Sequence, residues 1–209
     1  EISLRLQLPM NPAGCGNVQA VVDIYVGGEF EGSLALTQLN NWNRNSDAES
    51  IGAGTFFFVQ AAANKNKALY LQNKFISKTL AAQLLREAKQ TMLKDFGKTN
   101  IALGEVQKLV RGSKEIPLPG LPDVLAPMYS VPYKDGKWKG NQGDAYIELV
   151  RFTKDGPQIE SLNVYGASAK KDSPHYTDQM EMFTRQQTKK MTLNKAEVYK
   201  NAKSLYHPQ

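Results

Sequence analysis

The sequence has little that could support metal or redox chemistry. Its 209 residues include one cysteine, Cys15, and two histidines, His175 and His207. A single cysteine excludes an internal disulfide and a cysteine-rich metal site, and so few nitrogen and sulfur ligands argue against a dedicated zinc site. No run approaches the roughly 18 consecutive apolar residues that a membrane span needs. We therefore predict no metal site and no membrane partner for this segment.

Signatures of nucleotide and nucleic-acid binding are also sparse. Gly14 and Gly16 lack the rest of either glycine-rich phosphate fingerprint, and aromatic residues do not alternate with basic ones as single-strand readers require. The net charge of +6 is spread along the chain. A basic surface could meet anionic lipid, nucleic acid or a cell-wall polymer, but an even spread favours a simple role in solubility. We expect no cofactor and no nucleic-acid partner.

What the sequence does contain is typical of a soluble globular segment. Its length suits one domain, and its apolar content of 41% is ordinary. Alternating apolar and polar residues predict strands over residues 2–8 and 18–26, which could form a hairpin. Helical spacing predicts helices over residues 34–42 and 77–96, the second ending at Gly97.

In other stretches the sequence pattern does not settle the secondary structure. Residues 51–63 suit either a buried helix or a strand, because a short apolar run fits both. An element opens near Leu103 and continues to Val110, and the proline-rich residues 116–132 predict an ordered loop. Near the end, Thr192 could cap an amphipathic helix with Leu193, Ala196 and Tyr199 on its apolar side.

The most informative stretch runs from residue 141 to residue 179. Residues 144–152 and 159–165 resemble strands, and the Lys154-Asp155-Gly156 turn between them predicts a hairpin. An ordered loop should follow. Ser173 then suits a helix N-cap and Pro174 the first helical position, which predicts a short helix beginning there.

Within this stretch a set of motif residues resembles the C-terminal signature of the penicillin acylase family of N-terminal-nucleophile hydrolases, which includes cephalosporin and acyl-homoserine lactone acylases. The set is Tyr165, Gly166, Ser168, Ser173, Pro174, His175, Tyr176, Asp178 and Gln179. Further similar positions are Gly143-Asp144-x-Tyr146, Gly104-Glu105-Val106 and Leu118-Pro119-Gly120-Leu121-Pro122. The resemblance runs from about Leu36 to Pro208. Residues 1–33 are a β-rich stretch without a clear match, and residues 34–209 are the acylase-like segment.

The resemblance implies an α+β fold, as part of a four-layer αββα sandwich with peripheral helices. It implies that the parent protein hydrolyses the amide of an acylated small molecule such as a β-lactam or an acyl-homoserine lactone. The nucleophile would be a Ser, Cys or Thr at the start of a mature chain, whose free α-amine acts as base. Glu1 is none of these. We therefore expect a C-terminal segment of a β chain that is inactive alone.

The same resemblance implies partners, location and a metal. The partners would be the upstream part of the β chain, the α chain and the amide substrate. The location would be periplasmic or secreted, and calcium would bind elsewhere in the parent protein, since this chain shows no contiguous calcium loop.

Three candidate positions could touch the chemistry. By resemblance, Asp144 would support catalysis by orienting a histidine or the nucleophile's amine, with Glu148 as the competing carboxylate; Asp144 could equally cap backbone N–H groups at a strand start. His175 is interpreted as part of a structural motif that holds the C-terminal helix against the sheet. Gly14-Cys15 resembles a self-cleavage junction, but a small thiol in a turn is the favoured interpretation.

Two other functions remain open from the residues alone. The segment could be a free-standing, non-catalytic binding module that uses its proline-rich loop and basic surface. Nucleic-acid binding would rest on charge alone, and it would show a steep salt dependence.

Overall fold

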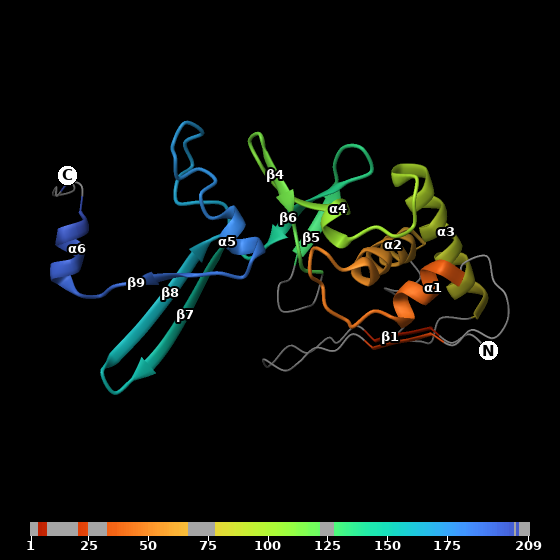
Figure 1. Ribbon diagram of the computed structural model, residues 1–209, viewed down its shortest axis with the longest axis horizontal. Coiled ribbons are helices and arrows are strands. Elements are labelled where there is room, and N and C mark those ends of the chain that lie inside the picture. The colour runs from red at the N-terminus through yellow and green to blue at the C-terminus, as the bar shows by residue number, and fades with distance from the viewer. Residues whose placement is uncertain are drawn as a thin grey trace. The chain divides into compact units, whose positions relative to one another are not determined.

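The computed structural model describes residues 4–7, 21–24, 33–66, 78–121, 128–202 and 204, and it divides the chain into two compact units (Figure 1). Unit 1 covers Glu1–Gly143 and unit 2 covers Asp144–Gln209. Each unit combines helices with an antiparallel or mixed sheet, so the predicted α+β class is confirmed. The four-layer arrangement is the expectation for a complete protein, and the division at residue 33 stays a prediction.

The first two strands form the predicted hairpin. Strand β1 (Leu4–Gln7) pairs antiparallel with β2 (Val21–Ile24), and Leu4 lies opposite Ile24. Cys15 and its glycine neighbours lie outside the described residues, so the interpretation of that junction is untested.

The helices of unit 1 are α1 (Ser33–Asn40), α2 (Ile51–Lys65), α3 (Lys78–Phe96) and α4 (Leu103–Val106). The undecided stretch 51–63 is helical. Ser50 sets its start, because the hydroxyl accepts a hydrogen bond from the Ala53 amide at 3.1 Å and so satisfies an otherwise orphaned donor. Tertiary packing around α2 buries both sides of this helix, which is why its apolar pattern resembled a strand as well.

Helix α3 follows its sequence pattern closely. Leu84, Ala88 and Met92 are fully buried, and Phe96 packs at the edge of the same core. Gly97 ends the helix with a backbone φ of +69°, a left-handed conformation that costs little without a Cβ. The predicted helix and its stop are confirmed.

The core of unit 1 joins these helices to one strand of its sheet. The rings of Trp42 and Phe56 have centroids 5.3 Å apart. Phe57 on α2 meets Trp138 on the sheet edge to face, with centroids 5.2 Å apart and planes at 85°. This contact places the sheet against the helices of the same unit.

The four-stranded sheet of unit 1 has the strand order β4-β3-β6-β5. The strands are β3 (Gln107–Arg111), β4 (Lys114–Pro117), β5 (Met128–Pro132) and β6 (Trp138–Gly143). The single element predicted from Leu103 is therefore wrong, since α4 runs directly into β3. The predicted loop over residues 116–132 is wrong at both ends, where β4 and β5 lie. Both are edge strands, and an edge strand tolerates proline because one of its sides needs no N–H donor.

A buried amide holds the segment that follows β4. Gln107 is fully buried, and its side-chain nitrogen donates to the carbonyl oxygens of Leu118 and Gly120 at 3.2 and 2.7 Å. Its side-chain oxygen accepts from the Ser130 hydroxyl at 2.7 Å. One polar side chain thus connects β3, β5 and the Leu118–Leu121 turn, with its donors and its acceptor in use.

Unit 2 is built on a long hairpin. Strand β7 (Tyr146–Thr153) pairs antiparallel with β8 (Gly156–Asn163), and β8 also pairs with β9 (Lys189–Met191). Figure 1 shows β9 running beside β8. The hairpin is confirmed with a two-residue loop, and Gly156 follows it with a φ of +110° that an L side chain rarely adopts.

Two short helices complete unit 2. They are α5 (Met180–Thr184) and α6 (Lys195–Asn201). The predicted terminal helix exists, but its cap is Asn194, whose oxygen accepts from the Ala196 and Glu197 amides. Thr192 is not the cap; its hydroxyl donates to the Glu197 carboxylate. No α6 residue is buried, and Leu193 just before the helix is exposed, so the predicted apolar side faces solvent. None of the described helices combines the length and apolarity needed to cross a bilayer.

We predict that Gly54→Ala destabilises unit 1. A Cβ at Gly54 would lie 2.1 Å from the Ile101 carbonyl oxygen, which is backbone and cannot rotate away. Alanine favours a helix over glycine by about 1 kcal/mol, and overpacking costs about 1–3 kcal/mol, so we expect a net loss. Both tryptophans lie in unit 1, so urea unfolding followed by their fluorescence reports on it. Ala61→Gly in the same helix is the control that measures how much an Ala–Gly exchange alone changes the free energy of unfolding. A Gly54→Ala protein more stable than the original would contradict the close contact with the Ile101 carbonyl.

We also predict that Glu115→Gln weakens unit 1 only above acidic pH. The Glu115 carboxylate pairs with Lys137 at 3.0 Å and Lys134 at 3.1 Å, and these partners lower its pKa below the ordinary 4.5. A lowered folded pKa contributes stability that is present above the unfolded value and lost as the pH falls through the folded one. We expect a loss of about 1 kcal/mol at pH 7 that shrinks below pH 4.5. The exposed Glu49→Gln is the control, and a pH-independent loss would refute the charge pairing.

Candidate functional site

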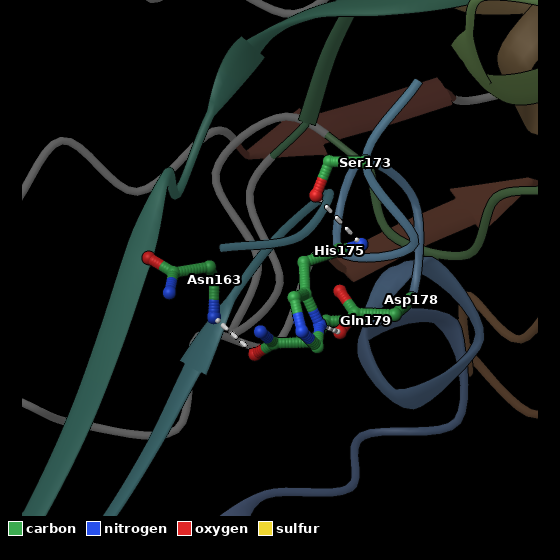
Figure 2. Close-up of polar contacts among 5 residues, drawn as sticks. All are labelled: Asn163, Ser173, His175, Asp178 and Gln179. Atoms are coloured by element: carbon green, nitrogen blue, oxygen red, sulfur yellow. Dashed lines mark hydrogen bonds and ion pairs between the residues drawn. The ribbon is translucent and has the colours of Figure 1, made fainter. Parts of the chain in front are cut away.

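The motif residues lie in the segment that connects β8 to α5, and Figure 2 shows five residues in and beside it. We call residues 165–179 the motif loop. The strand before it ends at Asn163, and the helix after it begins at Met180. The loop therefore connects two elements that are in contact, since α5 packs on β8.

Gln179 ties the two ends of the motif loop together. Its side-chain oxygen accepts a hydrogen bond from the backbone N–H of Asn163 at 2.9 Å (Figure 2). The backbone N–H of Gln179 itself donates to the Tyr165 carbonyl at 3.1 Å. The residue is 4% exposed. A buried bond of this kind stabilises modestly when made and costs about 1–3 kcal/mol when one partner is removed.

Gly166 marks a close backbone approach inside the loop. A Cβ at this position would lie 2.3 Å from the His175 carbonyl oxygen and 2.7 Å from an Asp178 carboxylate oxygen. Any side chain at Gly166 would therefore displace the loop backbone around His175. Glycine is needed here for space.

The two serines of the motif form local turns. The Ser168 amide donates to the His175 carbonyl at 3.0 Å, which closes the loop across its middle. The Ser173 hydroxyl accepts from the His175 amide at 3.2 Å, and the Tyr176 amide donates to the Ser173 carbonyl at 3.0 Å. These bonds satisfy backbone groups that would otherwise need water.

The predicted helix start at Ser173 and Pro174 is wrong. Ser173 does bond the amide two residues on, as a cap would, but residues 171–179 form turns and α5 begins only at Met180. A helix would pair the His175 carbonyl with the Gln179 amide. The carbonyl instead accepts from Ser168, and the amide instead donates to Tyr165. Tertiary bonds thus occupy the groups that would have propagated the helix.

The His175 ring is oriented by a carboxylate. Its Nδ1 lies 2.8 Å from an Asp178 oxygen, and the two side chains are 56% and 35% exposed (Figure 2). An aspartate at this distance from Nδ1 holds the imidazole ring in one orientation. The contact joins two motif residues within the loop, and the structural interpretation of His175 stays a prediction.

The structure places both candidate carboxylates, Asp144 and Glu148, at exposed positions. Asp144 is exposed and precedes β7, and Glu148 is exposed within β7. The Tyr146 hydroxyl donates to Glu148 at 3.0 Å, and this bond to a carboxylate raises the pKa of the phenol. The supporting catalytic role of either carboxylate therefore stays a prediction.

Asn163 is a hydrogen-bond partner of the motif loop that the sequence did not identify. It contributes through its backbone amide, so its side-chain type carries no signal. The strand pattern that ended near residue 165 was the only available indication. Among the described residues, no group of three or more His, Cys, Asp or Glu could hold a metal ion.

These features define a turn-rich, internally hydrogen-bonded loop between a strand and a helix of an α+β protein. The chain belongs to the penicillin amidase family, whose family model matches residues 9–200.

Relatives in this family carry the name acyl-homoserine lactone acylase PvdQ. The protein of Pseudomonas putida is 29% identical over 130 residues, which covers 59% of this chain and 16% of that protein. The protein of Pseudomonas savastanoi pv. phaseolicola is 25% identical over 181 residues, covering 77% and 23%. The chain thus spans about a fifth of the length of these curated relatives.

A solved structure, thermostable penicillin G acylase from Alcaligenes faecalis, is 18% identical, covering 75% of this chain and 30% of that one. Its TM-score is 0.32, too low to support an argument about the site.

We predict that Gln179→Leu loosens the motif loop. Leucine keeps the buried volume but removes the acceptor of the Asn163 amide, so that amide loses its buried partner. A cost of about 1–3 kcal/mol corresponds to roughly 5- to 150-fold faster hydrogen exchange at Asn163 if exchange there proceeds by local opening. Gln179→Glu retains an acceptor oxygen and serves as the control. Unchanged exchange in the leucine variant would show that the bond does not hold the loop.

Proposed function

We propose that this chain is the C-terminal part of an acylase that hydrolyses the amide bond of an acylated small molecule. The observation that carries the proposal is the match of residues 9–200 to the penicillin amidase family. The described residues fit a supporting role, because the hydrogen bonds described above for the motif loop join its residues to one another and to the Asn163 backbone. The nucleophile would belong to another part of the enzyme.

The proposed mechanism divides the work between the two parts. In the other part, an N-terminal Ser, Cys or Thr attacks the amide carbonyl while its own α-amine accepts the hydroxyl or thiol proton. Backbone N–H groups there stabilise the oxyanion. In this chain, the clamp between Gln179 and Asn163 fixes the end of β8 and the start of α5. Asp144, at the start of the same hairpin, is the candidate that orients the amine, as a positioning residue.

The substrate class follows from the relatives. Several carry acyl-homoserine lactone acylase in their names, and the matching family is penicillin amidase. We therefore propose an acyl-homoserine lactone or a β-lactam as substrate, with hydrolysis of its linear side-chain amide. The enzyme would act in the periplasm or outside the cell. Calcium, if bound, would be held by residues of the other part.

The proposal is tested by separating the two parts. The 209-residue chain alone should not hydrolyse a chromogenic acyl-amide or an N-acyl-homoserine lactone. The complete protein from the reading frame that contains this chain should hydrolyse at least one of them. Product is measured as released chromophore or as free homoserine lactone by mass spectrometry.

The outcomes separate the candidate functions. Activity that requires both parts supports the acylase, and Asp144→Asn should then lower its kcat with its fold intact, if the positioning role is correct. No activity with both parts present would defeat the proposal. Retention of a specific ligand by the isolated, stable chain would instead favour a free-standing binding module.

A further inference from the structure

One face of the unit 2 hairpin is apolar along its outer half. Side chains alternate between the two faces of a strand, and residues paired across strands share a face. Val150 pairs with Ile159, and Ile159 pairs with Met191 on β9. Phe152 pairs with Pro157 in the same set of positions. We call these five residues the apolar face.

The apolar face is open to solvent in the structure. Phe152 is 85% exposed, and Val150 and Met191 are each 45% exposed. An exposed contiguous apolar surface on a soluble protein marks an interaction site or an aggregation risk. Toward the base of the hairpin the same face continues with the exposed carboxylate of Glu148 and then Tyr146, so the apolar face is confined to the outer half.

The opposite face of the same strands has a different composition. It presents Leu149 at 56% exposure, together with Arg151, Gln158, Glu160 and Lys190. Only one exposed large apolar residue stands among charged and polar ones. The hairpin is therefore amphipathic in its outer half, and only one side is suited to burial.

The free edge of β7 adjoins the apolar face. Within the described residues β7 pairs only with β8, so its other side presents unpaired backbone groups. The strand has eight residues, and its register with β8 runs without a bulge from Tyr146 to Thr153. It contains no proline and no lysine, which are common protections of an edge strand.

We propose that the apolar face and the β7 edge form a docking surface for the remaining polypeptide of the same acylase. This inference rests on the proposed function. The relatives are about four to six times as long as their matched regions, so the proposed complete acylase would supply a large body of polypeptide to cover this surface. A strand of that body would pair with β7, and an apolar layer would bury Phe152 and Val150. A second copy or unit 1 of this chain are the alternative occupants.

The test is site-specific photo-crosslinking in the complete protein. Phe152→p-benzoylphenylalanine should form a crosslink whose peptide, identified by mass spectrometry, belongs to the acylase outside these 209 residues. Leu149→p-benzoylphenylalanine on the opposite face is the matched control and should give at least a tenfold lower yield. A crosslink to residues 1–143, a crosslink to a second copy, or equal yields at both positions would overturn the proposal.

Thiol labelling provides a second readout. In the native complete protein, Val150→Cys and Phe152→Cys should react at least tenfold more slowly than Leu149→Cys, because only their face is covered. Equal rates would overturn the docking surface. Neither measurement needs catalysis, so an inactive protein with these protections would defeat the acylase proposal alone. An active protein without them would defeat the docking surface alone.

Discussion

The close approach of two backbone strands at Gly166 is the constraint on which the motif loop depends. Because glycine has no Cβ, the His175 carbonyl can reach the Ser168 amide, and the Gln179 amide can reach Tyr165. Those two bonds use the donor and acceptor that a helix over the same residues would have paired with each other. The loop therefore exists at the expense of a helix that its serine-proline start would otherwise favour, and β8 and α5 are held by a compact set of turns.

The two units differ in how completely they bury their apolar side chains. Unit 1 closes a core in which Leu84, Met92 and Leu103 are inaccessible, and its sheet meets the helices through Trp138. Unit 2 has a small buried group around Leu162 and Met180, while the outer hairpin keeps its apolar face open. A sheet of three strands with one apolar face needs a covering layer to gain much free energy from burial. This difference is the reason for proposing that the outer hairpin of unit 2 is an interaction surface.

Local signals predicted the elements that have long, regular patterns. Helix α3 was predictable because its stripe repeats every fourth residue over five turns and ends at a glycine, and the β7–β8 hairpin because Asp-Gly separates two apolar runs. The errors arose where long-range contacts overrode local preference. Proline at the ends of β4 and β5 suggested a loop, since nothing local reveals that both are edge strands. At the motif loop, the residues were identified by resemblance, but their bonding to Asn163 involves a backbone group with no sequence signature.

The sequence by itself determined the family resemblance, because that depends on residue types at short spacing, and the resemblance in turn implied the α+β class and identified the motif residues. Only the tertiary structure decided that Ser173 and Pro174 form turns, that Gly166 is required for space, and that one face of the hairpin is open. Each of these depends on which backbone or side-chain groups meet across a gap of many residues. Such contacts are set by packing and by competition for hydrogen bonds, and neither can be predicted from the preferences of neighbouring residues.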